Sequence, residues 1–187
     1  MQITVKAFNY IACVFLTLSS AWVSAGEDKL GIELKDLDRL LKSSSENMIF
    51  IDVRDPVEIM FTGFTDAVDS NIPYQMVDRT RWNEKKGVFM MNMNANFAEE
   101  VKTLLKKKGL TKDARIVTMC RSGSARGKPS AEYLKKNGFS GAQYLINGFQ
   151  GSSIKKGDHQ GMRVKNGWQN SGMPWQKKAN PKKIYRN

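Results

Sequence analysis

One cysteine follows an apolar run and stands at the start of a short polar loop that contains two arginines. The run Ile116-Val-Thr-Met119 is followed by Cys120, and Arg121-Ser-Gly-Ser-Ala-Arg126 then leads into helix-forming sequence. In an arrangement of strand, tight loop and helix, the loop N–H groups and the helix N-terminus converge on one point. A cysteine sulfur held at that point, beside Arg121 and Arg126, is favoured as the thiolate. The spacing therefore predicts that Cys120 is a nucleophile that handles a sulfur atom or a small oxyanion.

Cys120 is expected to be the only thiol of the mature protein. The chain has two cysteines, and the other, Cys13, lies in an N-terminal segment with the pattern of a secretory signal peptide. An unpaired cysteine in an exported protein is either reactive or buried and inert. The residues around Cys120 favour the reactive interpretation.

The signal-peptide pattern covers residues 1–25. Lys6 is its only charge, residues 11–23 are mostly apolar, and Val23-Ser-Ala25 is a small-residue cleavage site. Ser19-Ser20 interrupts the apolar stretch, which is shorter than the ~20 residues of a membrane-spanning helix. We expect cleavage after Ala25, a periplasmic product and no membrane anchor after processing.

Composition indicates one domain with a basic surface. The 187 residues include 41% hydrophobic residues and carry a formal net charge of +12. We expect one packed domain over residues 26–175 and a basic, poorly ordered tail over residues 176–187. Positive charge steers anions toward a site and suits acidic partners, although it could also be only a solvated face. Nucleic-acid binding is not expected, because no recognition motif accompanies the charge.

Apolar strands that alternate with helices predict an α/β fold. We expect strands over residues 48–51, 116–119 and 142–146, and helices within 26–45 and over 57–62, 96–108 and about 129–137. This alternation implies a mainly parallel central sheet with helices on both faces. The methionine-rich stretch 88–94 is interpreted as a connection partly packed on the core.

Polar residues also follow the strand 48–51. Asp52 and Arg54 would lie near Cys120, because the carboxyl ends of parallel strands share one edge of the sheet. They could orient the cysteine loop or the substrate, but a strand-end ion pair is the favoured interpretation. We interpret Glu58, in the next helix, as structural.

Metal and histidine chemistry are not expected. His159 is the only histidine and lies in a polar insertion over residues 152–166, so we expect it on the surface and not in a cysteine–histidine pair. No cluster has zinc spacing. Copper binding by Met90, Met91 and Met93 is disfavoured, because methionine-rich stretches more often fill gaps in packing. We predict no metal and no cofactor.

Several short motifs, taken together in their order, resemble the rhodanese domain family from about Leu34 to Trp175. The resemblance rests on these stretches and residues: Ile51-Asp-Val-Arg54, Glu58, Gly63, Asn71-Ile-Pro73, Cys120-Arg-Ser-Gly123, Gly138-Phe139, Gly148-Phe-Gln-Gly151 and Gly167–Trp175. The closest likeness is to single-domain, exported rhodanese-like proteins.

The resemblance implies a rhodanese-like fold and a sulfurtransferase. Cys120 would take the outer sulfur of a donor such as thiosulfate as a persulfide and pass it to cyanide or a thiol. A protein is a further candidate for donor or acceptor. The anionic sulfur would be held by the loop residues Arg121, Ser122, Gly123, Ser124, Ala125 and Arg126, with Asp52 and Arg54 in support.

The loop is one residue longer than the usual sulfurtransferase form C-R-x-G-x-R. Arg126 stands six positions after Cys120, which is the loop length of phosphatases and arsenate reductases of the same fold. Those enzymes have a histidine before the cysteine, where this chain has Met119, and ester cleavage calls for a general acid that the loop lacks. Phe64 also stands where the family commonly has histidine. Sulfur transfer is therefore the prediction; an oxyanion enzyme, or a sulfur-binding module without turnover, is the alternative.

Overall fold

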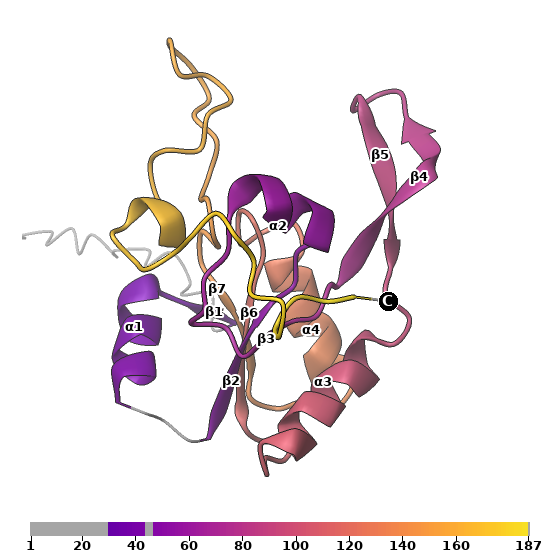
Figure 1. Cartoon of the computed structure of the whole chain (residues 1–187), viewed down its shortest axis with the longest axis vertical. Helices are drawn as coiled ribbons and strands as arrows, with labels where there is room; N and C mark the ends of the chain where they lie inside the picture. Colours follow the sequence, from indigo (N-terminus) through magenta and orange to yellow (C-terminus); the bar gives the residue numbers. More distant parts are fainter. Residues whose placement is uncertain (1–29, 44–46, 187) are drawn as a thin grey trace, which may run out of the picture.

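The central feature of the molecule is a five-stranded parallel sheet. The structure is a computed structural model that describes residues 30–43 and 47–186 (Figure 1). The strand order is β1-β7-β6-β2-β3, with bounds β1 Gly31–Ile32, β2 Met48–Asp52, β3 Ser70–Asn71, β6 Arg115–Met119 and β7 Ala142–Leu145. Every strand pair in this sheet is parallel. The predicted α/β fold with a mainly parallel sheet is confirmed, and β1 and β3 are short additions at its edges.

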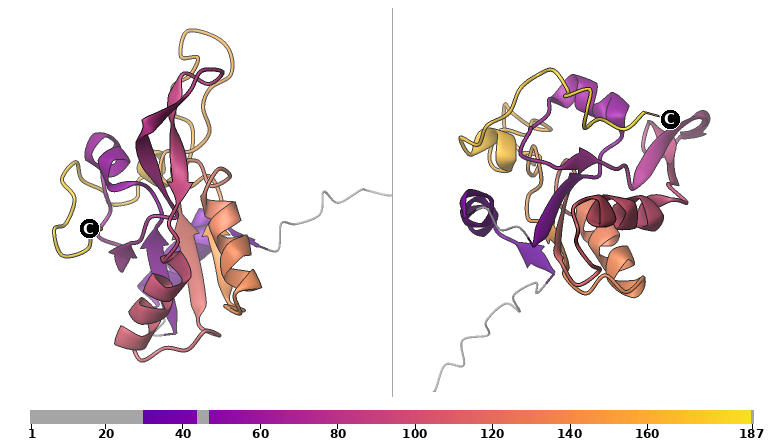
Figure 2. Two further views of the ribbon diagram at one scale, coloured as in Figure 1. Left: turned by 90° about the vertical axis from the view of Figure 1, so that its right-hand side faces the viewer. Right: turned by 60° about the horizontal axis from the view of Figure 1, so that its bottom comes forward.

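Alternate residues of the strands pack into two separate cores, one on each face of the sheet. Ile49 and Ile51 of β2 pack on one face with α3 (Phe97–Lys107) and α4 (Gly127–Lys136). Met48 and Phe50 pack on the other face with α1 (Leu34–Lys42), α2 (Pro56–Thr62) and the short 3₁₀ helix η1 (Trp168–Asn170). Because strand side chains alternate in direction, a continuous apolar strand needs cover on both faces, and the helices provide it (Figure 2).

The helices begin and end close to the expected positions. Asp55 accepts a hydrogen bond from the Val57 N–H and caps α2, and Pro56 occupies the first turn. Helix α4 begins at Gly127, two residues earlier than expected. Pro129 therefore lies in the first turn, where a missing N–H costs nothing.

Residues 88–94 were expected to be a connection partly packed on the core, but residues 88–93 form a strand that belongs to neither core cluster, and only Asn94 is buried. Strands β4 (Gln75–Asn83) and β5 (Val88–Met93) form an antiparallel hairpin that projects from the body of the molecule (Figure 1). Their side chains are partly or fully exposed. Trp82 and Phe89 pack edge to face, 5.1 Å between ring centroids. In the described part of the chain no second layer covers the two strands of the hairpin, so its methionines are not buried against the core as the sequence analysis expected.

The C-terminal segment is held against the domain over residues 176–186, and the expectation of poor order was wrong there. Gln176 forms an antiparallel bridge with Phe64. The Asn71 N–H donates to the Lys183 carbonyl at 2.7 Å, and the Tyr185 hydroxyl donates to Glu100 at 3.1 Å. These main-chain and side-chain bonds extend the domain beyond Trp175. The proposed signal segment, residues 1–25, lies outside the described residues.

Candidate functional site

The two predicted motifs meet at the carboxyl edge of the sheet. Strands β2 and β6 are neighbours, with Asp52 in register with Met119. The Val53 N–H donates to the Met119 carbonyl at 2.9 Å, immediately before Cys120. The parallel sheet thus places the end of β2 beside the cysteine loop, as expected.

The turn after β7 holds the cysteine from the other side. The Phe149 N–H donates to the Cys120 carbonyl at 2.8 Å, and the Gln150 N–H donates to the Arg121 carbonyl at 2.8 Å. Gly148 has φ +55°, and a Cβ built there would lie 2.2 Å from the Cys120 carbonyl oxygen. The close approach of these two backbones therefore requires glycine.

The loop itself folds back onto the start of α4. The Lys128 N–H donates to the Gly123 carbonyl at 2.8 Å, which closes the loop, while Ser124 and Ala125 are exposed at its outer end. A Cβ built at Gly127 would lie 3.5 Å from the Cys120 sulfur. The first residue of the helix therefore packs directly against the sulfur, and the positive end of the helix dipole faces it.

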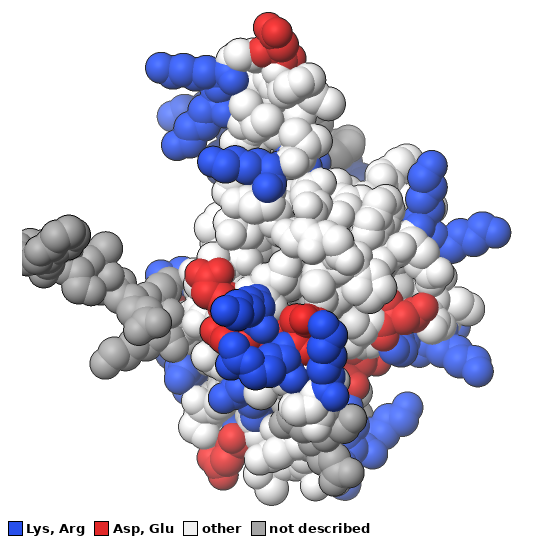
Figure 3. All heavy atoms as spheres, turned by 90° about the vertical axis from the view of Figure 1, so that its left-hand side faces the viewer, with Lys and Arg blue, Asp and Glu red and all other residues white. Residues whose placement is uncertain are grey.

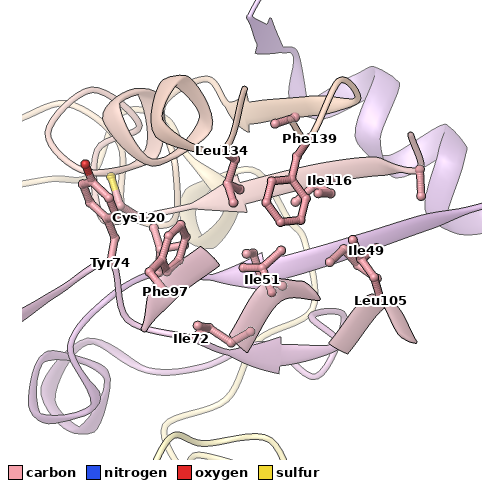
Figure 4. Close-up of a cluster of buried hydrophobic side chains, with 14 residues drawn as sticks. Ile49, Ile51, Ile72, Tyr74, Phe97, Leu105, Ile116, Cys120, Leu134 and Phe139 are labelled. Atoms are coloured by element: carbon pink, nitrogen blue, oxygen red, sulfur yellow. The ribbon is translucent and has the colours of Figure 1, made fainter. Parts of the chain in front are cut away.

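Cys120 is fully buried and belongs to a core cluster that also contains Tyr74. Its exposed fraction is 0%, and Figure 4 shows its sulfur at one end of that cluster. Burial raises the pKa of Tyr74 above its usual value, and Tyr133 and Glu132 raise it further. Tyr74 is therefore neutral near pH 7. Because Cys120 is fully buried, its sulfur is covered in this conformation of the protein.

The two loop arginines are held differently. Arg121 is exposed, and its Nε donates to the Gln150 side chain at 2.7 Å. Arg126 is buried, and its Nη2 lies 2.6 Å from a carboxylate oxygen of Glu58. Arg126 Nη1 and Glu58 Oε1 are buried and have no hydrogen-bond partner in the part of the chain that the structure describes. Such orphaned polar atoms beside a nucleophile indicate a place where a polar ligand can bind.

Sequence reasoning missed two of the charged groups at this site. Glu58 was expected only to support the fold, yet it contacts the cysteine loop through Arg126. Arg163, in the polar insertion, was not considered. Burial lowers the pKa of Arg163 and so does Arg121, whereas Glu58 and Cys120 raise it, so Arg163 lies within electrostatic range of these three residues. One signal for Glu58 was its position in the first turn of the helix that begins at the same sheet edge.

Asp52 and Arg54 form the expected strand-end ion pair. Both side chains are fully buried, with Arg54 Nη2 2.5 Å from Asp52 Oδ2. Arg54 also donates to Thr62 and to the Gly63 carbonyl, so all three of its side-chain nitrogens are bonded. Its guanidinium lies over the ring of Phe149, 4.0 Å from the centroid, and Phe149 holds Cys120. The pair therefore supports the cysteine loop from behind.

The described residues contain no other site of the kinds considered above. Among them, no group of three or more His, Cys, Asp and Glu residues could hold a metal ion. His159 is exposed, as expected. No helix in the described ranges is both long and apolar enough to span a bilayer.

A family model and one solved structure support the fold, and a further solved structure shows a weaker similarity. The family model described as a rhodanese-like domain matches residues 33–155. The solved structure of Rv0390 from M. tuberculosis is 22% identical, with a TM-score of 0.57, and the match covers 79% of this chain and 97% of that one. A rhodanese-related protein from Thermoplasma volcanium is 22% identical over 63% of this chain and 84% of its own, with a TM-score of 0.37. A search of curated proteins found no match.

Proposed function

Because the chain belongs to the rhodanese-like domain family, we propose that it is a sulfurtransferase with Cys120 as the sulfur carrier. The observation that carries the proposal is the placement of the Cys120 sulfur against the first residue of α4, in a loop that ends on Arg126. Backbone N–H groups and a helix N-terminus stabilise an anionic sulfur without a paired base. His159, the only histidine, is exposed on the insertion and is not assigned a part in the reaction.

The reaction has two steps, and in each step one new bond to the transferred sulfur forms as one S–S bond breaks. The Cys120 thiolate attacks the outer sulfur of thiosulfate, and sulfite leaves with the electron pair of the broken bond. A thiophilic acceptor, cyanide or a thiolate, then attacks the outer sulfur of the Cys120 persulfide, and the cysteine leaves as thiolate. No external oxidant or reductant is required.

Charged groups around the cysteine would position the anionic donor. Arg126 Nη1 is buried and unpartnered among the described residues, and it can donate to a sulfonate oxygen. Arg121, in the same loop, and Arg163, in the polar insertion, add positive potential. The Glu58 carboxylate carries the opposite charge, and its contact with Arg126 weakens the attraction of the loop for an anionic donor.

A turnover assay tests this proposal. Wild-type protein supplied with thiosulfate and cyanide should release sulfite and thiocyanate, and Cys120→Ser should release neither. The surface variant His159→Ala, in the same insertion as Arg163, is the matched control and should retain wild-type turnover. Persulfide formation without release to cyanide or small thiols would instead indicate a sulfur-binding module.

A second candidate, an oxyanion enzyme such as a phosphatase or arsenate reductase, is favoured by one observation. The C-x5-R loop is long enough for a tetrahedral anion, and Glu58 brings to it the carboxyl group that the loop sequence lacks. Hydrolysis of an aryl phosphate, or reduction of arsenate with an added thiol, would support this candidate if Cys120→Ser abolished it. Absence of both activities, together with thiocyanate formation, would exclude it.

Export is also part of the proposal. Cleavage after Ala25 would leave Cys120 as the only thiol, so that no internal disulfide competes for it. Expression of the full chain in a bacterium, followed by N-terminal sequencing of the periplasmic product, should give a protein that starts at Gly26. An uncleaved, cytoplasmic product would contradict this.

A further inference from the structure

Helix α2 exposes apolar side chains beside the cysteine loop. Phe61 is 84% exposed and Met60 is 69% exposed, and Val57 is also largely in solvent, whereas Ile59 is fully buried. A surface helix ordinarily turns its apolar residues to the core. Three exposed ones within two turns form an apolar patch, and such patches are a feature of interaction surfaces.

The position of Glu58 ties this exposed face to the site. Glu58 pairs with Arg126 of the cysteine loop. Residues three apart on a helix are neighbours on its surface, so Phe61 adjoins Glu58. Phe61 therefore stands at the border of the catalytic loop.

The polar insertion also contains exposed apolar side chains. Met162 and Val164 are 50% and 53% exposed, and they flank Arg163. Arg163 is anchored, since its Nη1 donates to the Gly151 carbonyl and its own carbonyl accepts from Asn170 at 3.0 Å. Figure 1 shows this insertion and the β4–β5 hairpin both projecting beyond the edge of the sheet where β2 and β6 end, with α2 between them.

Positive charge accompanies these apolar side chains. Residues 152–166 carry four basic residues and one acidic residue, and Figure 3 shows basic side chains gathered on this projecting segment. The cysteine loop, which α2 contacts through Glu58, contributes Arg121 and Arg126. Thiosulfate needs the charge, but a small anion gains nothing from exposed phenylalanine and methionine. The surface therefore fits a larger ligand that is both acidic and apolar.

We propose that the apolar rim formed by Val57, Met60, Phe61, Met162 and Val164 docks a protein partner that presents a cysteine to Cys120 from a segment of acidic and apolar residues. This inference rests on the proposed sulfur transfer and names the substrate class. The partner thiolate attacks the outer sulfur of the Cys120 persulfide, one S–S bond forms as another breaks, and Cys120 leaves as thiolate. Acidic residues of the partner face the arginines, and apolar ones cover the rim.

An anionic membrane would match the same charge and apolarity, but it fits less well. The rim residues adjoin Glu58 and Arg163, which lie near the buried nucleophile, and a bilayer seated there would cover the cysteine without supplying sulfur. A partner that carries a thiol uses both the rim and the cysteine. The membrane is therefore treated as an alternative outcome of the test.

Synthetic peptides serve as the probe. One peptide has a cysteine flanked by leucine and aspartate residues, and its counterpart has lysine in place of aspartate. Transfer rates are measured from the Cys120 persulfide of wild type, Met60→Ser/Phe61→Ser and the control Val88→Ser/Met93→Ser. The control removes exposed apolar side chains from β5 of the hairpin, which the rim does not include.

If the rim docks the partner, substitutions in it should slow transfer to the acidic peptide and not transfer to cyanide. Wild type should transfer sulfur to the acidic peptide about tenfold faster than to the lysine peptide. The Met60→Ser/Phe61→Ser variant should lose about tenfold toward the acidic peptide and less than about twofold toward cyanide, because only the peptide uses the apolar anchors. The control should match wild type. Equal rates for the two peptides, or parallel losses for peptide and cyanide, would overturn the inference.

A binding measurement separates this inference from the proposed function. Fluorescence anisotropy with the labelled peptides and Cys120→Ser protein needs no sulfur transfer, so it applies even if thiosulfate gives no persulfide. Acidic-peptide binding that weakens with Met60→Ser/Phe61→Ser supports the rim, whereas unchanged binding overturns it. Retention of wild type, but not of the rim variant, on vesicles of anionic phospholipid without selective peptide binding would assign the surface to a membrane and also overturn it.

Discussion

The Arg126 guanidinium and the Glu58 carboxylate lie 2.6 Å apart at the mouth of the cysteine loop, and each keeps one buried polar atom without a partner in the described chain. The contact joins the end of the loop to α2. It also leaves Arg126 Nη1 and Glu58 Oε1 ready to bind a polar group. The pair thus holds the loop in place and leaves Arg126 Nη1 available to bind an anion.

The pair predicts a stability effect that a second substitution partly reverses. Arg126→Met leaves the Glu58 carboxylate buried without its partner, and we expect it to lower the unfolding free energy by about 2–3 kcal/mol. Adding Glu58→Gln removes the isolated charge and should recover at least about 1 kcal/mol. Urea unfolding of the two variants and wild type measures both values. Additive losses in the double variant would contradict the role of the pair.

Gly148 should tolerate no side chain. In Gly148→Ala the new Cβ meets the Cys120 carbonyl oxygen, so the cysteine loop must shift and persulfide formation should fall sharply. Gly87→Ala is the matched control, because its φ of +61° is close to the +55° of Gly148 and no atom lies within 4 Å of its Cβ. We expect the control to lose only about 1 kcal/mol of unfolding free energy, because alanine is disfavoured in the left-handed backbone region, and to keep its activity. Similar losses of activity in both variants would show that the close approach is unimportant.

Arg163 should contribute to the attraction of the anionic donor. Arg163→Gln removes a positive charge that lies near Cys120, Arg121 and Glu58, and we expect kcat/KM for thiosulfate to fall about fivefold, with a weaker dependence on salt. Lys165→Gln removes the same charge from an exposed position in the same insertion and should change little. Steady-state kinetics at low and high salt compare them. Equal effects of the two substitutions would mean that only net charge matters.

Particular residues show what the sequence could and could not predict. The apolar runs of β2 and β6 predicted strands of one parallel sheet, so Cys120 and Asp52–Arg54 were expected at one edge; that the two strands are neighbours was not predicted. The hairpin was missed because its strands bury almost nothing, and apolar periodicity reports burial. Arg163 could not be placed near Cys120, since its position depends on how a long insertion folds back through Asn170 and Gly151.

Tyr74 predicts a loss of stability in alkali. Burial raises the pKa of Tyr74 above its usual value of 10.0, so the unfolded chain loses this proton at a lower pH than the folded protein does. The contribution to stability is therefore complete below about pH 10 and is lost as the pH rises through the folded pKa. Urea unfolding between about pH 9 and about pH 11 should show a shallower decline for Tyr74→Phe than for wild type. Equal slopes would contradict the assignment.

The mass of the protein after incubation with thiosulfate tests the central claim most directly. The account predicts that the wild type gains the mass of one sulfur atom, that peptide mapping places it on Cys120, and that an added thiol removes it. Cys120→Ser should gain nothing. A wild-type protein that stays unmodified, or an adduct that persists in Cys120→Ser, would contradict sulfur transfer by this cysteine.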